Sequence, residues 1–146
     1  MVTRTVTRML PVALCAAALL LAGCGGSPTA PAPVAKTETF TGTLQPLGTD
    51  FKTFSVTTQG TTDLSVTVTS LTTVAASTPV TGVPIGVGFG SVSGTTCVLQ
   101  IQSAAAVVGQ ELFAPSGAAA GAYCVQIFDP ATLTEAVTYA LTVKHY

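Results

Sequence analysis

TTDLSVTVTSL, residues 61–71, decides the fold, because apolar and polar side chains alternate from residue 63 to residue 69. One side of the extended chain carries Leu64, Val66 and Val68, and the other carries serine and threonine side chains. A period of two in β-branched residues is typical of a strand with one buried face. The stretch therefore predicts a β-strand whose aliphatic side chains enter a hydrophobic core.

The same alternation recurs in six further runs on either side of this stretch, and turn-forming clusters separate them. No segment after residue 23 has a convincing helical period. The chain is therefore expected to form an all-β fold, an antiparallel β-sandwich of about seven or eight strands in one domain, residues 37–146. The further runs and their core residues are 39–44 (Phe40, Leu44), 50–58 (Phe54, Val56), 83–92 (Val83, Ile85, Val87, Phe89), 95–102 (Leu99, Ile101), 121–129 (Tyr123, Val125, Ile127) and 136–146 (Val137, Tyr139, Leu141, Val143).

The run VPIGVGFGSV, residues 83–92, carries glycine at every second position, Gly86, Gly88 and Gly90. It lacks the third glycine of the dinucleotide-binding fingerprint, and no helical pattern follows it. We interpret it as a strand whose glycines mark a bulge or the close approach of another backbone or a ligand. The alternative is a flat binding face cleared of side chains.

The N-terminus has the features of an export signal. Arg4 and Arg8 precede an apolar run, residues 9–21, which is too short for a comfortable membrane span of about 20 residues. Small residues then end the run. The predicted signal peptide covers residues 1–23, and the alternatives are a secretory signal with an accidental cysteine or a short buried helix.

The end of this signal, Leu21-Ala22-Gly23-Cys24, resembles the bacterial lipobox. The resemblance implies cleavage between Gly23 and Cys24 and attachment of a diacylglyceryl group to the Cys24 thiol. Two or more acyl chains make a stable anchor, so we expect a protein held on the bacterial cell envelope. Gly25 follows where an aspartate is associated with inner-membrane retention, which favours the outer membrane if the cell is Gram-negative.

Residues 24–36 predict a lipidated cysteine followed by a flexible, extended linker, because glycine, serine and proline dominate the segment. It could hold the domain up to roughly 35 Å from the membrane.

The expected mature chain has three lysines against six acidic residues, a formal charge of −3. This balance offers no electrostatic footprint for nucleic acid and no basic patch for anionic lipid.

Two cysteines, Cys97 and Cys124, remain outside the signal and the lipid site. In an exported domain they most simply form one disulfide, which would stabilise the fold by roughly 3–4 kcal/mol. Their strand faces stay open, because Cys97 shares parity with Leu99 while Cys124 alternates against Val125.

Three stretches together resemble the bacterial pre-peptidase C-terminal domain, whose pattern includes D-x-x-T-F-x-V, G-x-Y-x-V-x-V and Y-x-L-x-V. They lie at Asp50 to Val56, Gly121 to Ile127 and Tyr139 to Val143. The resemblance implies a jelly-roll-like β-sandwich of a kind usually appended to secreted hydrolases, with suggested roles in secretion, adhesion or polymer binding.

Catalytic and metal-binding groups are sparse, so we predict no catalytic residues, no metal and no cofactor. His145 is interpreted as a solvated chain end, and GSVSG, residues 90–94, places valine where a nucleophilic serine would stand. The carboxylates are scattered among turns and strand edges. Asp129 with Glu135 is the least implausible calcium site, and an Asp-Pro turn is the simpler interpretation.

We therefore expect a membrane-tethered, non-catalytic binding or structural module that contacts an envelope protein or polysaccharide and binds no nucleic acid. A protein partner is favoured, because the chain has no tryptophan and Tyr123 and Tyr139 are assigned to the core. The alternatives are a small envelope hydrolase or a calcium-dependent carbohydrate-binding module.

Overall fold

The computed structural model describes residues 34–57, 64–114 and 118–146. The predicted signal peptide and lipid site, with Leu21, Ala22, Gly23 and Cys24, lie outside these ranges. No helix in the described ranges is long and apolar enough to cross a membrane. The described chain forms eight strands: β1 (Lys36–Leu44), β2 (Thr49–Val56), β3 (Ser65–Thr73), β4 (Ile85–Ser93), β5 (Thr96–Ala106), β6 (Glu111–Phe113), β7 (Gly121–Phe128) and β8 (Val137–His145).

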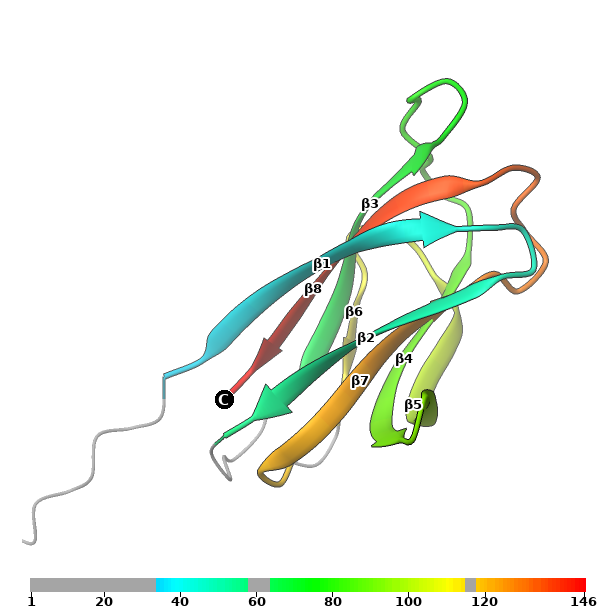
Figure 1. Ribbon diagram of the computed structural model, residues 1–146. Coiled ribbons are helices and arrows are strands. Elements are labelled where there is room, and N and C mark those ends of the chain that lie inside the picture. Colours follow the sequence, from blue (N-terminus) through cyan, green and yellow to red (C-terminus); the bar gives the residue numbers. More distant parts are fainter. Residues whose placement is uncertain (1–33, 58–63, 115–117) are drawn as a thin grey trace, which may run out of the picture. The chain divides into compact units, whose positions relative to one another are not determined.

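The strands form two four-stranded antiparallel sheets with the orders β1-β8-β3-β6 and β2-β7-β4-β5 (Figure 1). Their pairing is nested: β1 pairs with β8, β2 with β7, β3 with β6 and β4 with β5, as in one long hairpin. Two further pairings complete the sheets: β3 with β8 in the first sheet and β4 with β7 in the second. Eight strands in this order make a jelly roll, so the predicted jelly-roll-like β-sandwich is confirmed.

The alternation in the sequence correctly predicts the core. Apolar side chains of both sheets meet between them, while partly buried residues such as Phe40, Ile101 and Tyr123 pack at the margin. For Val83 and Leu99 the prediction was wrong, because both are only half-buried and neither packs in the core. The fully buried residues predicted from the sequence are Leu44, Phe54, Val56, Leu64, Val66, Val68, Ile85, Val87, Phe89, Val125, Ile127, Val137, Tyr139, Leu141 and Val143.

The predicted strands differ from the observed strands mainly at β1, β5 and β6, and β5 continues to Ala106, four residues past its expected run. β1 begins at Lys36, three residues before the expected strand and one residue before the expected start of the sandwich. β6 was not predicted at all, because its three residues are too few to show alternation.

The sandwich has two ends, which we name by the chain path. At the proximal end β1 begins and β8 finishes, and the hairpin turn between β4 and β5 lies there. The distal end carries the connections 45–48, 74–84, 107–110 and 129–136. In Figure 1 the proximal end runs along the bottom of the sandwich, from the C-terminus to the turn between β4 and β5, and the distal end is at the upper right.

The glycines of β4 allow close approach of neighbouring groups. A Cβ atom on Gly86 would lie 2.2 Å from the Phe128 ring, and one on Gly90 would lie 1.8 Å from the Val98 carbonyl oxygen. All three alternating glycines are buried. The strand interpretation is therefore confirmed, and the alternative of a bare, flat binding face is wrong.

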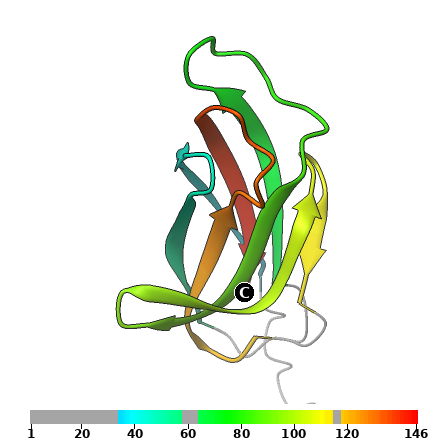
Figure 2. The same ribbon diagram turned by 90° about the vertical axis from the view of Figure 1, so that its right-hand side faces the viewer.

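Cys97 of β5 and Cys124 of β7 form the predicted disulfide, although β4 lies between their strands. Their Cα atoms are 5.8 Å apart, whereas strands that flank a third ordinarily lie about 10 Å apart. The β4–β5 hairpin closes this distance by bending out of its sheet (Figure 2). Gly90 makes the approach possible, because it presents no side chain to the β5 backbone.

A β-bulge explains the faces of the two cysteines. Phe89 pairs with Ile101, but the next residue, Gly90, pairs with Leu99, so Gln100 is an extra residue in β5. From Leu99 back to the start of β5, the side chains that would have faced the core therefore face outward. Cys97 thus lies on the outer face of the sheet. Cys124, which pairs with Gly90, lies on the same outer face.

Candidate functional site

Asp129 organises the distal end of the sandwich. Its Oδ1 atom accepts hydrogen bonds from the backbone N–H groups of Thr132 (2.8 Å) and Leu133 (3.1 Å), three and four residues further on, which closes the turn after the Asp-Pro pair. Its Oδ2 atom accepts a bond of 2.8 Å from the N–H of Leu47, in the connection between β1 and β2. The turn interpretation of Asp129 is confirmed, and the structure adds a partner 82 residues away along the chain.

Hydrogen bonding determines the charge state of this buried carboxyl group. Burial alone would raise the pKa of Asp129, because desolvation disfavours the ionised form. The N–H groups of Leu47, Thr132 and Leu133, with the Thr132 hydroxyl, outweigh that effect and hold the pKa below its ordinary value. The ionised carboxylate therefore belongs to the folded state at neutral pH.

The same geometry bears on the calcium site considered at Asp129 and Glu135. Both oxygens of Asp129 already accept hydrogen bonds from the chain, whereas Glu135 is exposed. Within residues 34–57, 64–114 and 118–146, no group of three or more histidine, cysteine or acidic side chains could hold a metal ion. Asp129 is an anchor for the surrounding loops.

A third connection joins this arrangement through Thr132. Its Oγ1 atom lies 2.6 Å from the Pro84 carbonyl oxygen and 3.0 Å from Asp129 Oδ1. Pro84 ends the connection between β3 and β4. One carboxylate and one hydroxyl thus tie together three of the four distal connections.

Backbone strain is concentrated at this end. Among the described residues, three that are not glycine have positive φ values: Leu47 (57°), Ser77 (53°) and Ala131 (73°). Each lies in a different distal connection. Left-handed conformations are unfavourable for residues with a Cβ atom and tend to persist at functional sites that the surrounding structure holds in place.

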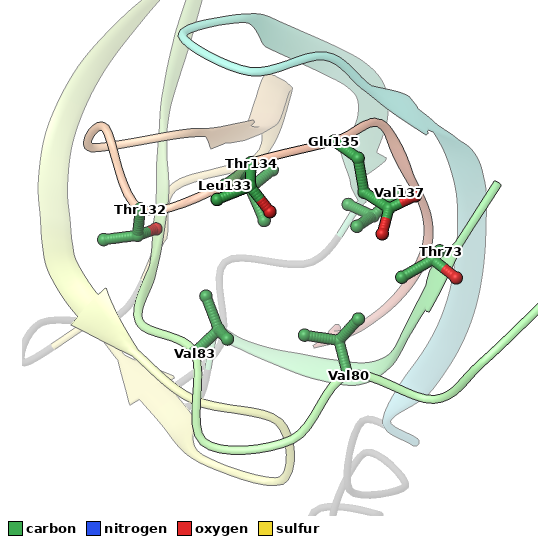
Figure 3. Close-up of a pocket in the computed structure, with 8 residues that line it drawn as sticks. All are labelled: Thr73, Val80, Val83, Thr132, Leu133, Thr134, Glu135 and Val137. Atoms are coloured by element: carbon green, nitrogen blue, oxygen red, sulfur yellow. The ribbon is translucent and has the colours of Figure 1, made fainter. Parts of the chain in front are cut away.

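A small cavity of about 70 Å³ opens between the 74–84 and 129–136 connections (Figure 3). Val80 and Val83 point across the opening toward the segment with Leu133 and Thr134, and the Glu135 side chain is directed inward beside Val137. The lining is otherwise completed by Thr73 and Thr132. The cavity therefore combines apolar walls with one carboxylate.

A second cavity, of about 110 Å³, lies toward the proximal end. Its surface is polar and apolar in about equal parts, and the Tyr123 hydroxyl donates a hydrogen bond of 3.0 Å to the Ala119 carbonyl oxygen. It is lined by Leu64, Phe89, Gln100, Ile101, Ala114, Ala118, Ala119 and Tyr123. None of the described residues that line it is charged.

His145 is not the solvated chain end that we predicted from the sequence. Its side chain is only 2% exposed, and its Nε2 atom lies 3.1 Å from Glu38 Oε1. Its ring packs against Phe54, with ring centroids 5.2 Å apart. The prediction was wrong because β8 continues to the last residues, so the alternation that buries Val143 also buries His145.

Tyr139 and Asp50 link the two sheets. The Tyr139 hydroxyl donates a hydrogen bond of 2.5 Å to Asp50 Oδ2, and Lys52 Nζ lies 3.0 Å from the same oxygen. Burial alone would raise the pKa of Asp50. The hydrogen bonds from Tyr139 and Lys52 outweigh this effect and hold the pKa below its ordinary value. Burial and the bond to Asp50 raise the pKa of Tyr139. Gly42 leaves room for the contact, since a Cβ atom there would lie 2.6 Å from both oxygens.

Comparison with known proteins gives little further information. No protein-family model matches the chain, and no curated protein matches it. Among solved structures, the chain is similar to the Yersinia pseudotuberculosis-derived mitogen (YPM), with a TM-score of 0.47 and 13% sequence identity. The match covers 77% of this chain and 88% of that chain.

Proposed function

We propose that this chain is a lipid-tethered protein of the bacterial cell envelope whose β-sandwich serves as a non-catalytic binding module. The observation that carries the proposal is Leu21-Ala22-Gly23-Cys24, placed directly behind a basic start and a short apolar run. In this account residues 1–23 are the signal, residues 24–36 the anchor and linker, and the sandwich is of the pre-peptidase C-terminal kind. The outer membrane is the favoured destination if the cell is Gram-negative.

The disulfide supports the proposal of export. Disulfides form and persist in oxidising compartments outside the cytosol and are rare within it. The Cys97–Cys124 pair is built into the fold, because Gly90 and the bulge at Gln100 are both needed to bring β5 and β7 together. A chain with a disulfide built into its fold in this way is suited to a compartment outside the cytoplasmic membrane.

The arrangement of the acidic residues supports a non-catalytic role. Asp50, which pairs with Ile127 near the distal end, is engaged by Tyr139 and Lys52, whereas Asp129 is engaged by backbone N–H groups of the connections. Hydrolysis by paired carboxylates needs two such groups facing each other across a substrate site. These two carboxylates are instead committed to separate structural clusters.

The proposal is tested by fractionating bacteria that express the Cys24→Ser variant. We expect the wild-type protein in the membrane fraction and the variant in the soluble fraction, because the variant lacks the thiol that accepts the lipid. Cys15→Ser is the matched control, since Cys15 lies inside the predicted signal and its loss should leave the protein with the membranes. A Cys24→Ser variant that remains fully in the membrane fraction would contradict the anchor.

A further inference from the structure

The edges of both sheets are poorly suited to recruiting a partner by strand addition. β6 has only three residues, and β5 carries two register shifts along its pairing with β4. β1 and β2 each point a charged pair, Lys36 with Glu38 and Asp50 with Lys52, to the core side of their sheets. Short edges, bulges and inward-pointing charges are the features by which proteins prevent edge-to-edge pairing.

The distal end, in contrast, is a preorganised surface. Asp129 and Thr132 fix three of its connections, so little conformational entropy remains to be lost when a partner binds. The same end exposes apolar side chains, with Leu47 at 77% and Val74 at 50% of their full accessibility. The expected linker joins the sandwich at the opposite end, where β1 begins, so the tether does not attach here.

The charges around the distal cavity favour a cationic ligand over an anionic one. The four distal connections contain two acidic residues, Asp129 and Glu135, and no lysine or arginine. The Asp129 carboxylate is buried among its donors, whereas Glu135 is exposed and directed into the cavity (Figure 3). An anionic ligand would be repelled, and a cationic group would find one accessible carboxylate.

We propose that this cavity receives a lysine side chain of a partner envelope protein. A lysine has an unbranched apolar stem that packs on hydrophobic surface while its ammonium group stays at a polar rim. Val80, Val83 and Leu133 would contact the stem, and Glu135 would pair with the ammonium group. Exposed Leu47 and Val74 supply further apolar contact area at the same end for the residues that flank the lysine.

This inference rests on the proposed function, because it names the partner class of the tethered module. The two can nevertheless fail separately. Fractionation of the Cys24→Ser variant reports on the anchor alone, while the titration described next reports on the cavity, whether or not the anchor is present.

The experiment is a methyl NMR titration of the full-length protein, purified from membranes and held in nanodiscs. The probe is Nα-acetyl-lysine-N-methylamide, and the neutral comparison probe is Nα-acetyl-norleucine-N-methylamide, which has a similar stem without the ammonium group. We expect the methyl signals of Val80, Val83 and Leu133 to shift with the lysine probe. Glu135→Gln should weaken that binding about fivefold, to the level of the norleucine probe, as for a partly exposed ion pair of about 1 kcal/mol.

Glu111→Gln is the matched control, because Glu111 is also an exposed acid but does not line the cavity. It should bind the lysine probe as the wild type does. Both substitutions are at exposed positions, so unchanged methyl spectra without probe would establish that the variants fold. The proposal is overturned if the lysine probe causes no shift, if both probes bind equally, or if Glu135→Gln has no effect. It is also overturned if a neutral oligosaccharide such as cellotetraose shifts these methyl signals and the lysine probe does not.

Discussion

The two ends of the sandwich are held together by different kinds of interaction. At the distal end, the Asp129 carboxylate accepts hydrogen bonds from two connections, and Thr132 reaches a third. Toward the proximal end, the Cys97–Cys124 disulfide clamps β5 onto β7, and His145 has one polar partner, Glu38, within the described residues. Non-covalent bonds to an ionised group stabilise one end, and a covalent bond stabilises the other.

The difference means that the two ends should respond to different reagents. Protonation would weaken the distal end without affecting the disulfide, and a reductant would open the disulfide without affecting Asp129. Asp129 lies five residues beyond Cys124 along β7, roughly 17 Å away in an extended strand, so their contributions should be independent.

Removing the disulfide is expected to have the largest effect. The Cys97→Ala/Cys124→Ala double variant should lose about 3–4 kcal/mol of unfolding free energy, because the cross-link closes a loop with a sequence separation of 27 residues. Urea denaturation with and without reductant measures the loss. Reductant should lower the unfolding free energy of the wild type by the same amount and leave that of the double variant unchanged. If the double variant loses less than about 1 kcal/mol, the disulfide is not needed to hold the bent hairpin.

Removing the distal anchor should come next. Asp129→Ala leaves the N–H groups of Leu47, Thr132 and Leu133 without their acceptor, which should cost about 2–3 kcal/mol. Glu135→Ala, an exposed change in the same connection, should stay within about 0.5 kcal/mol of the wild type. Equal losses in the two variants would mean that Asp129 does not organise the loops.

Acid should act on the distal end through the same carboxylate. The pKa of Asp129 is lowered in the folded protein, so its stabilising contribution is complete above the unfolded pKa of about 3.9 and is lost as the pH falls through the lower folded value. Urea denaturation from pH 7 to pH 2 should therefore show a steeper decline for the wild type than for Asp129→Ala. Asp50 and Glu38, whose pKa values are also lowered, will leave some slope in the variant. Parallel profiles would contradict the role of Asp129.

The smallest effect is expected at the proximal histidine. His145→Phe keeps an aromatic ring against Phe54 and removes a buried Nδ1 atom that has no hydrogen-bond partner among the described residues. The lost bond to Glu38 is offset by the removal of that unpaired polar group, so stability should change by less than about 1 kcal/mol. His145→Ala, which deletes the ring, serves as the comparison and should lose more. A His145→Phe loss as large as that of Asp129→Ala would remove the distinction between the two ends.

Local sequence pattern was sufficient to predict seven of the eight described strands and the disulfide, but not the three-residue strand β6. Alternation in stretches such as 64–68 and 137–143 reports directly on which side chains face the core, because the period of a strand is two. The same rule would have predicted the burial of His145, had the alternation been followed two residues past Val143. The disulfide followed from the count of cysteines left after the signal.

Features that depend on distant pairing could not be predicted from local pattern. The bulge at Gln100 lies where β5 pairs with the glycine strand β4, and the glycines alone could not indicate that the extra residue is in β5. The sequence suggested a turn at Asp129 but could not indicate that Leu47, far away in the chain, shares the same carboxylate. The candidate cavity was missed for the same reason, since its residues come from connections that only the strand order brings together.

The most direct test of the central claim, that a lipid on Cys24 holds this sandwich on the envelope, is mass spectrometry of the membrane-extracted protein. We predict an N-terminal peptide that begins at Cys24 and carries a thioether-linked diacylglyceryl group. A chain that still begins at Met1, or a free thiol at Cys24 in the membrane fraction, would contradict the claim.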